Sequence, residues 1–544
     1  HNGRRRQRQM CIRDRHVKNE LLFKTNSWTF IAILIGLIIF LPISEVFIQL
    51  FNTSESWLHL KKTVFSTYLI NTIILTVGTG LLSTLIGVFC AWVVACCEFP
   101  LKKFFEWALI LPLAIPTYVS AYAYFDILEL SNPMLIWVRE NINLEAMQSL
   151  NSFFVYFFTI LVLSSVLYPY IYLLTRASFL KQGNQLIEAG LSLGHNINEI
   201  FWKIALPMAR PAVFAGLSLV IMETLNDYGA VKHFGIPTFT SGIFRTWLGM
   251  GDMSGALKLA AYLMLLILIL LLIEKKARSR ARYHENSGSN KPFKKIILSR
   301  KKSIITITLC SIPFLFGFLI PVFRLSLWAF ISQDAIRSIS ILSLVKNSLF
   351  LSVAVSLLTV VLALLLVFSA KYFQSKLTSF TNRFAILGYS VPGAVIAMGI
   401  LLLSAQINKI YVDIILSGSL LILIFAFITR FFAVAWQPID SVMERNCKNI
   451  NDASRSLGIP AIFSLIKVNI PLIKNTLITA SILVFIDSMK ELPLTLILRP
   501  FNFNTLSTAT FDLSSQAQIV ESSVPALCII CLLYTSDAAD DDHC

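Results

Sequence analysis

Two pairs of carboxylates with the same spacing lie near the ends of long apolar stretches of this chain. Glu223 and Asp227 are four residues apart near the end of one stretch, and Asp487 and Glu491 repeat that spacing near the end of another. Carboxylates inside a membrane are costly and usually face a cavity or a partner. Because residues four apart share a helix face and carboxylate oxygens suit hard cations, both pairs are candidates for an acidic translocation pathway. The alternative is that Lys232 or Lys490 neutralises some of these acids in structural ion pairs.

Two polar segments interrupt the apolar pattern. The first reads "EAGLSLGHNINEIFWKIALP" (188–207), and a weaker copy reads "NDASRSLGIPAIFSLIKVNIP" (451–471). In each, a short helix leads to a central Gly, which permits positive φ, and Asn196 or Asn198 can cap the helix that follows in the first copy. One copy could simply connect two membrane crossings, but two copies at equivalent places favour docking onto a paired partner.

The sequence contains no pattern for catalysis by the chain itself. No G-x-x-x-x-G-K-[ST] phosphate loop occurs, so we expect no ATP hydrolysis by this chain. A nucleophile elbow, a His-Glu-x-x-His pair and a cysteine-pair zinc pattern are also missing, and His195 and His233 are isolated. We therefore assign no catalytic residue and no firm metal ligand, and we expect the chain to bind no cofactor.

The composition explains which elements must position these residues. The chain has 544 residues, of which 56% are hydrophobic and 14% charged. Apolar runs of about 20 residues can cross a bilayer as helices, and strand-like alternation is weak, so the sequence predicts an all-α polytopic membrane protein. The net charge is +16. The basic residues that cause it lie between the apolar runs, which favours a lipid bilayer over nucleic acid as the partner. The expected runs are near 28–50, 69–97, 105–127, 152–175, 210–227, 256–273, 304–329, 345–370, 384–404, 411–436, 475–496 and from 519 onward.

Basic residues predict the orientation of these crossings. The segment 275–302 is rich in Lys and Arg and should remain cytoplasmic, as should the N-terminus and the segment 188–207. Lys232 and Arg245 then fall on the outer side, an exception that a partly re-entrant segment there would explain.

The chain is also an internal duplication. Asn71 matches Asn347 and Pro116 matches Pro392 at an offset of 276, whereas Gly194 matches Gly458 at an offset of 264. Six crossings separate the copies, so the repeats are parallel and should be related by an axis along the membrane normal, with a pathway between them. We expect a first membrane half at 16–274, a basic cytoplasmic linker at 275–302 and a second membrane half at 303–530.

Both ends resemble translated sequencing-adaptor sequence. "RRQRQMCIRDR" near the start and "CLLYTSDAAD" near the end are encoded by the two strands of one short DNA. We therefore expect residues 1–15 and 531–544 to be artefacts and the last of the twelve helices to be truncated.

The polar segments carry a family resemblance. Their pattern is similar to the coupling-helix motif of binding-protein-dependent ABC importers, Glu-Ala-Ala, three residues, Gly, nine residues, Ile-x-Leu-Pro. Gly190 replaces the second Ala in the first copy, and Asp452 replaces Glu in the second. The resemblance implies ATPase-coupling roles for Glu188, Ala189, Gly194, Leu206, Pro207, Asp452, Ala453, Gly458, Ile470 and Pro471.

The resemblance extends over residues 16–530. The stretches 223–247 and 490–508 look like the ferric-iron branch, in which both membrane halves are fused, while thiamine, phosphonate and polyamine permeases share the wider pattern. It implies a bacterial plasma-membrane permease that works with two cytoplasmic ABC ATPase subunits, which use ATP and Mg, and with an extracytoplasmic substrate-binding protein. An ion-coupled secondary transporter also uses repeats, but it has no need of two matching docking segments.

Overall fold

The computed structural model describes residues 27–51, 55–181, 192, 194, 196–279, 296–332, 340–373, 378, 381–382, 385, 388, 391–410 and 418–541. Helices dominate this part of the chain. The short strands β1 (Cys97–Glu98) and β2 (Ile296–Ile297) pair in parallel, Cys97 opposite Ile296. The prediction of an all-α protein is confirmed.

Within the described residues, nine helical segments are long and apolar enough to cross a membrane. Two further helix pairs pass the same test but bend sharply, Lys102–Ala114 with Thr117–Ala123 by 93° and Ala461–Leu472 with Lys474–Lys490 by 78°. The protein is therefore polytopic. The nine segments are Ser27–Ile48, Phe65–Cys96, Leu144–Leu180, Phe201–Asn226, Met253–Leu270, Arg300–Ile331, Ile341–Phe373, Gly393–Ile410 and Leu420–Arg445.

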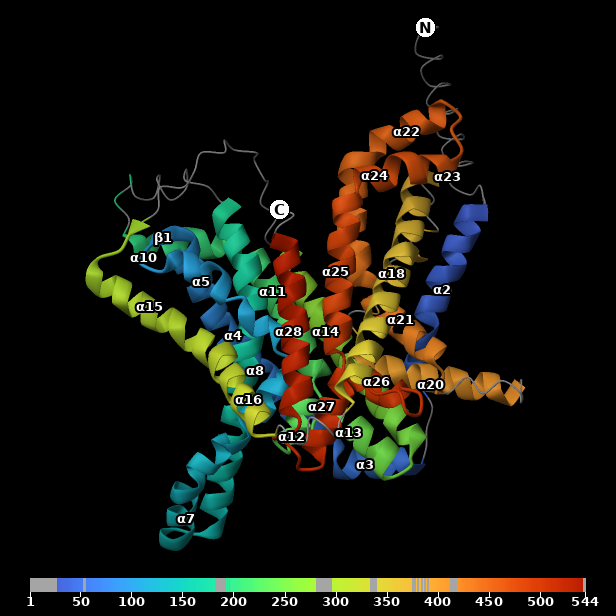
Figure 1. Cartoon of the computed structure of the whole chain (residues 1–544). Helices are drawn as coiled ribbons and strands as arrows, with labels where there is room; N and C mark the ends of the chain where they lie inside the picture. The colour runs from blue at the N-terminus through green and yellow to red at the C-terminus, as the bar shows by residue number, and fades with distance from the viewer. Residues whose placement is uncertain are drawn as a thin grey trace, which may run out of the picture. The chain divides into compact units, whose positions relative to one another are not determined.

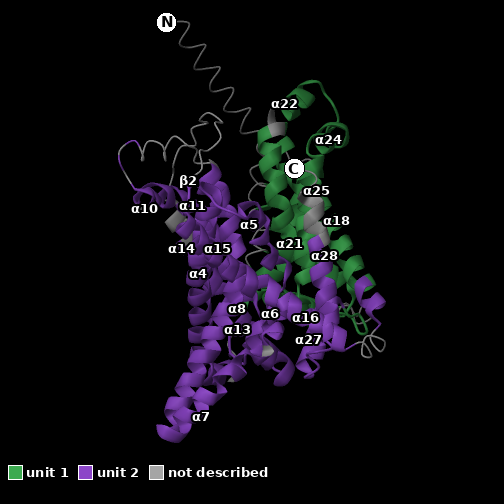
Figure 2. Ribbon diagram, turned by 60° about the vertical axis from the view of Figure 1, so that its left-hand side comes forward, with its two compact units in different colours: residues 1–49, 346–504, 535–544 green, residues 50–345, 505–534 purple. Residues whose placement is uncertain are grey.

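The chain forms two compact units (Figure 2). Unit 1 contains residues 1–49, 346–504 and 535–544. Its described elements are α2 (Ser27–Ile48), α18 (Ile341–Phe373), α20 (Gly393–Ile410), α21 (Leu420–Val442), the π-helix η7 (Met443–Cys447), α22 (Lys448–Ser456), α23 (Ala461–Ser464), the π-helix η8 (Leu465–Asn469), α24 (Ile470–Leu472), α25 (Lys474–Lys490) and α26 (Pro493–Leu498).

Unit 2 contains residues 50–345 and 505–534. Besides the two strands, its elements are α3 (Glu55–Thr63), α4 (Phe65–Cys96), α5 (Lys102–Ala108), η1 (Leu111–Ala114), α6 (Thr117–Ala123), η2 (Phe125–Ser131), α7 (Asn132–Asn141), α8 (Leu144–Lys181), α10 (Ile197–Ile200), η3 (Phe201–Ala205), α11 (Leu206–Asn226), α12 (Gly229–His233), α13 (Phe239–Phe244), η4 (Arg245–Gly249), α14 (Met253–Ser279), α15 (Arg300–Phe314), η5 (Leu315–Leu319), α16 (Ile320–Ile331), α27 (Leu506–Ser515) and α28 (Ser523–Asp541).

The units do not follow the boundaries of the two sequence repeats. The first helix of the first repeat, α2, packs on α20, where a Cβ on Gly399 would lie 2.3 Å from the Pro42 carbonyl oxygen. The first helix of the second repeat joins the other unit, and a Cβ on Gly317 would lie 2.2 Å from the Ser165 carbonyl oxygen on α8. Each repeat therefore contributes its first helix to the unit built mainly from the other repeat, and glycine permits both close approaches.

The candidate sites lie at the ends of these bundles. In unit 1, α22, α23 and α24 lie at one end of α18, and α26 lies toward the other (Figure 1). In unit 2, α10 lies at one end of the bundle, and α12 and α7 lie toward the opposite end (Figure 1). The two polar segments and the four acids are thus at different ends of their own units.

Candidate coupling and translocation sites

The second polar segment folds as two short helices joined at Gly458. Helix α22 ends at Ser456, Gly458 has φ of 71°, and α23 begins at Ala461. The expected turn and its positive φ are confirmed for this copy. No heavy atom lies within 4 Å of the position a Cβ would take on Gly458, so the backbone conformation, rather than crowding, makes this a glycine position.

The residues named for the second copy lie around this turn. Asp452 and Ala453 are on α22, where Asp452 forms an ion pair with Arg455 one turn later. Ile470 and Pro471 open α24, which precedes the bend into α25. A buried amide contact closes the segment, because Asn469 Nδ2 donates to Asn451 Oδ1 at 3.1 Å.

The first copy is described in part. Glu188 and Ala189 lie outside the described residues. Gly194 has φ of 82°, so its positive φ is confirmed as well. Asn196 precedes α10, and its backbone N–H donates to Glu199 Oε2 at 3.1 Å, which is half of a capping box. Leu206 and Pro207 begin α11, as a proline in the first helical turn allows.

Both copies contain a π-helix that the sequence did not predict. The π-helix η3 begins at Phe201 and η8 begins at Leu465, 264 residues later, and each ends two residues before the Pro that closes the motif. π-Helices are rare and often mark functional positions. The shared position shows that the duplication preserved the local backbone geometry and not only the residue pattern.

The polar segments also expose large apolar side chains. Leu457 is 76% exposed and Phe463 is 52% exposed in the second copy, and Trp202 is 66% exposed in the first. Ile466 adds to the surface of η8 at 55% exposure. Such groups beside polar residues are typical of a surface that a partner covers.

Asp227 is a buried helix cap. The expectation that it shares a helix face with Glu223 is wrong, because α11 ends at Asn226 and Asp227 is extended. Its carboxylate accepts hydrogen bonds from the backbone N–H groups of Ala230 and Val231, at 3.0 and 3.1 Å, and from Thr117 Oγ1 at 2.5 Å. The acid thus stabilises the start of α12.

Glu491 has the equivalent position in the second repeat. It follows the end of α25 and accepts a hydrogen bond from the Leu494 backbone N–H at 3.1 Å. Its other oxygen lies 3.0 Å from Arg430 Nε, and both side chains are at most 6% exposed. Arg430 also donates to the Val391 carbonyl oxygen at 3.3 Å. The cation beside Glu491 is therefore Arg430, while Lys232 lies over the Phe511 ring at 4.5 Å.

Glu223 and Asp487, the first acids of the two pairs, have surroundings that differ from those of Asp227 and Glu491. Glu223 on α11 and Asp487 on α25 are half-buried rather than buried. Within the part of the chain that the structure describes, no three His, Cys, Asp or Glu side chains come together as a metal site. The arrangement divides the four acids into two that hold short helices and two that stay partly accessible.

The comparisons with known proteins agree with this geometry. Residues 83–276 match the family model described as the inner membrane component of binding-protein-dependent transport systems. The Fe(3+)-transport system permease protein FbpB 2 of Haemophilus influenzae is 28% identical over 509 residues, covering 92% of this chain and 95% of that protein. These findings support an ABC-importer permease.

Sulfate permeases are similar over a smaller region. The protein CysT of Synechocystis is 26% identical over 207 residues, 38% of this chain and 70% of that protein. The protein CysW of Escherichia coli K12 is 26% identical over 199 residues, 36% of this chain and 65% of that protein. All three relatives are permease proteins, which supports the role of a transport subunit. The apolar helices and the inner-membrane family description support a multi-pass plasma-membrane protein. The family description also implies a substrate-binding protein and ABC partner subunits.

The sequence did not predict the side chains that contact Asp227 and Glu491. Thr117 is 110 positions from Asp227, and Arg430 is 61 positions from Glu491, so spacing along one helix could not reveal either contact. One signal was available for Arg430, because it is a cation within the apolar run 411–436. A charge in such a run usually has a partner.

Proposed function

We propose that this chain is the fused transmembrane permease of an ATP-driven importer for ferric iron. The observation that carries the proposal is its similarity to a Fe(3+)-transport permease over 92% of this chain and 95% of the relative. The two glycine turns at Gly194 and Gly458 support the coupling part of the proposal, because both have the positive φ that the coupling-helix pattern requires.

In this proposal, two cytoplasmic ABC ATPase subunits bind the two polar segments. The ATPases use ATP and Mg, and this chain binds no cofactor of its own. Glu188 and Asp452 would make polar contacts on the ATPases, and the exposed Trp202, Leu457 and Phe463 would add apolar contact. Closure of the ATPases around ATP would then move α11 and α25 through η3 and η8. Because the two polar segments then face the cytoplasm, the N-terminus also lies on the cytoplasmic side in this proposal.

A substrate-binding protein would deliver iron to the opposite side of the membrane. Glu223 and Asp487, with Asp227 and Glu491 behind them, give the pathway acidic character that suits a hard cation. Because tight chelation would trap the ion, these acids should attract and pass iron rather than hold it. The similarity to CysT and CysW makes sulfate the second candidate, although the carboxylates of Glu223 and Asp487 on the proposed path would repel an anion.

The test is reconstitution of the chain in proteoliposomes with an ABC ATPase and a substrate-binding protein from the same organism. Uptake of radiolabelled ferric iron that requires ATP and the binding protein would support the proposal. Uptake of radiolabelled sulfate instead would replace the substrate and keep the mechanism. Uptake driven by an ion gradient without an ATPase would overturn the mechanism and favour a secondary transporter.

A further inference from the structure

The last turn of α18 contacts residues before and after α22, the first helix of the second polar segment. Lys371 and Tyr372 are neighbours in this turn. Adjacent residues of a helix point about 100° apart, so the two side chains reach different parts of the segment. Both contacts lie within unit 1.

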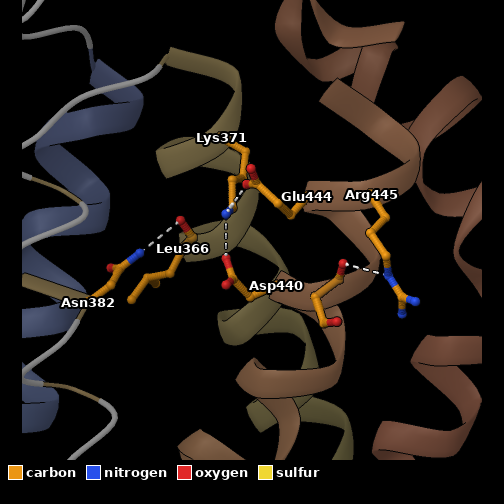
Figure 3. A network of polar contacts seen from close by, with 7 residues as sticks. Leu366, Lys371, Asn382, Asp440, Glu444 and Arg445 are labelled. Carbon is orange, nitrogen blue, oxygen red and sulfur yellow. Dashed lines mark hydrogen bonds and ion pairs between the residues drawn. The ribbon is translucent and has the colours of Figure 1, made fainter. Parts of the chain in front are cut away.

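Lys371 forms ion pairs with residues that precede α22. Its Nζ lies 3.1 Å from Asp440 Oδ1 at the end of α21 and 2.5 Å from Glu444 Oε2 in η7 (Figure 3). Asp440 and Glu444 are four residues apart and face the same cation. The pair is partly shielded, because Lys371 and Asp440 are 27% and 26% exposed. The ammonium group therefore joins α18 to the residues directly before α22.

Tyr372 holds the turn after α22. Its hydroxyl donates a hydrogen bond to the carbonyl oxygen of Ile459 at 3.2 Å, and the side chain is 4% exposed. Ile459 directly follows the positive-φ Gly458, and its own backbone N–H donates to the Ser454 carbonyl oxygen at 3.0 Å. The hydroxyl thus fixes the position of the turn itself.

At the positions that match Lys371 and Tyr372, the first repeat has two small side chains. At the offset of 276, Lys371 and Tyr372 correspond to Ala95 and Cys96, which are buried. The first copy instead packs through aromatic rings, with the Trp92 ring centroid 5.1 Å from that of Phe201 and 5.4 Å from that of Phe179. Among the described residues, the contacts between polar segment and membrane helix are therefore aromatic in the first repeat and polar in the second.

We infer that Lys371 and Tyr372 are positioning residues through which the second coupling segment moves α18, a polar connection that the first repeat replaces by aromatic packing. This inference rests on the proposed function. Both contacts are made by one turn of α18. If an ATPase displaces α22, the contact before α22 and the contact after it therefore move α18 together. Removing either contact should let the segment move without the helix, so ATP is hydrolysed with less transport.

The experiment measures the number of ions transported per ATP hydrolysed in the reconstituted transporter, with the ion that the test of the proposed function identifies. Tyr372→Phe removes only the hydroxyl and keeps the ring. Lys371→Met removes only the charge, and Lys371→Arg keeps it. Tyr156→Phe is the matched control, because it removes another tyrosine hydroxyl, one that donates to Asn71 Oδ1 at 2.6 Å in unit 2.

We expect Tyr372→Phe and Lys371→Met to lower transport per ATP on the order of fivefold, the factor that matches one ordinary hydrogen bond. Lys371→Arg should restore the ratio, and Tyr156→Phe should leave it unchanged. The amount of chain in the membrane and the recovery of the ATPase should stay at wild-type levels. An unchanged ratio in both loss variants would overturn the inference, as would a loss of transport that only follows a loss of protein. If the wild-type chain recruits no ATPase, the proposed function itself fails before any variant is compared.

Discussion

The ion pair between Arg430 and Glu491 is buried on both sides, with side chains 6% and 4% exposed. Removing one member of such a pair leaves an uncompensated charge, which costs about 3–5 kcal/mol. We expect Arg430→Met to lower the free energy of unfolding by this amount. The double variant Arg430→Met with Glu491→Gln should recover most of it, because the amide oxygen can still accept from the Leu494 N–H. Thermal unfolding of the purified chain in detergent measures both. Equal stability of the single and double variants would contradict an energetic coupling between these residues.

Glu223 and Asp487 lead to a different expectation, because they are half-buried and lie within α11 and α25. Glu223→Gln combined with Asp487→Asn should lower ATP-dependent iron uptake at least about tenfold, since the carboxylate charge that attracts the cation is lost. Binding of the ATPase should be unchanged. Glu145→Gln removes an exposed carboxylate in the first turn of α8, so it serves as the control and should retain uptake. Wild-type uptake by the Glu223 and Asp487 variant would make these acids structural or peripheral.

Sequence reasoning located the acids but not their partners. The equivalence of Asp227 with Glu491 follows from the repeat offset, and both cap the start of a short helix, α12 or α26. The counterion of Glu491 could not be read from that offset, because the first repeat has Val166 where the second has Arg430. A hydroxyl from Thr117 serves Asp227 instead. Equivalent positions thus kept one function through different contacts.

The turn at Gly458 connects two short helices, and its φ of 71° is unfavourable for a β-branched side chain. Gly458→Val should cost about 1–3 kcal/mol locally and displace α22 relative to α23. We expect transport to fall while the chain remains in the membrane, with weaker recovery of the ATPase in pull-down. Gly458→Asn is the matched control, because Asn tolerates this conformation. Gly194→Val should act in the same way in the first copy, where φ is 82°. Unchanged transport and ATPase recovery in both Val variants would remove the docking role.

The close approach of η5 to α8 depends on Gly317, since a Cβ there would lie 2.2 Å from the Ser165 carbonyl oxygen. Gly317→Ala should therefore separate the two elements and lower the free energy of unfolding by about 1–3 kcal/mol. Gly249→Ala is the control, because a Cβ there would lie 3.9 Å from Arg245 Cγ, an ordinary van der Waals contact. Thermal unfolding in detergent compares the two variants. A larger loss in the control would show that the contact at Gly317 is not what the packing requires.

The sequence predicted where the helices lie along the chain, but it did not predict which helices pack against each other. Hydropathy predicted crossings near 28–50 and 304–329, and α2 and α15 to α16 occupy those stretches. It could not reveal that each of them packs in the unit of the other repeat, because lipid-facing and protein-facing apolar residues have the same hydropathy. The π-helices η3 and η8 were also invisible, since their residues differ little from those of an ordinary helix.

At the scale of the whole molecule, the exchange of first helices predicts how a split chain behaves. Cutting near Ser287, in the basic linker, and co-expressing both pieces should leave transport within about twofold of the intact chain, because we expect the linker to act only as a tether. The pieces should also co-purify in detergent, since α2 packs on α20, and η5 packs on α8. Affinity purification through one piece measures the association. A complete loss of transport with both pieces stably inserted would assign the linker a further role.

The exchange also sets an order of events during synthesis. Helix α2 leaves the ribosome more than 340 residues before α20, its partner across Gly399, exists. Likewise, the unit that holds most of the first repeat is incomplete until α27 and α28 are translated. Neither unit can therefore finish folding before most of the second repeat has been translated. Fusion of the two repeats in one polypeptide guarantees that the missing helices arrive in equal number and beside their waiting partners.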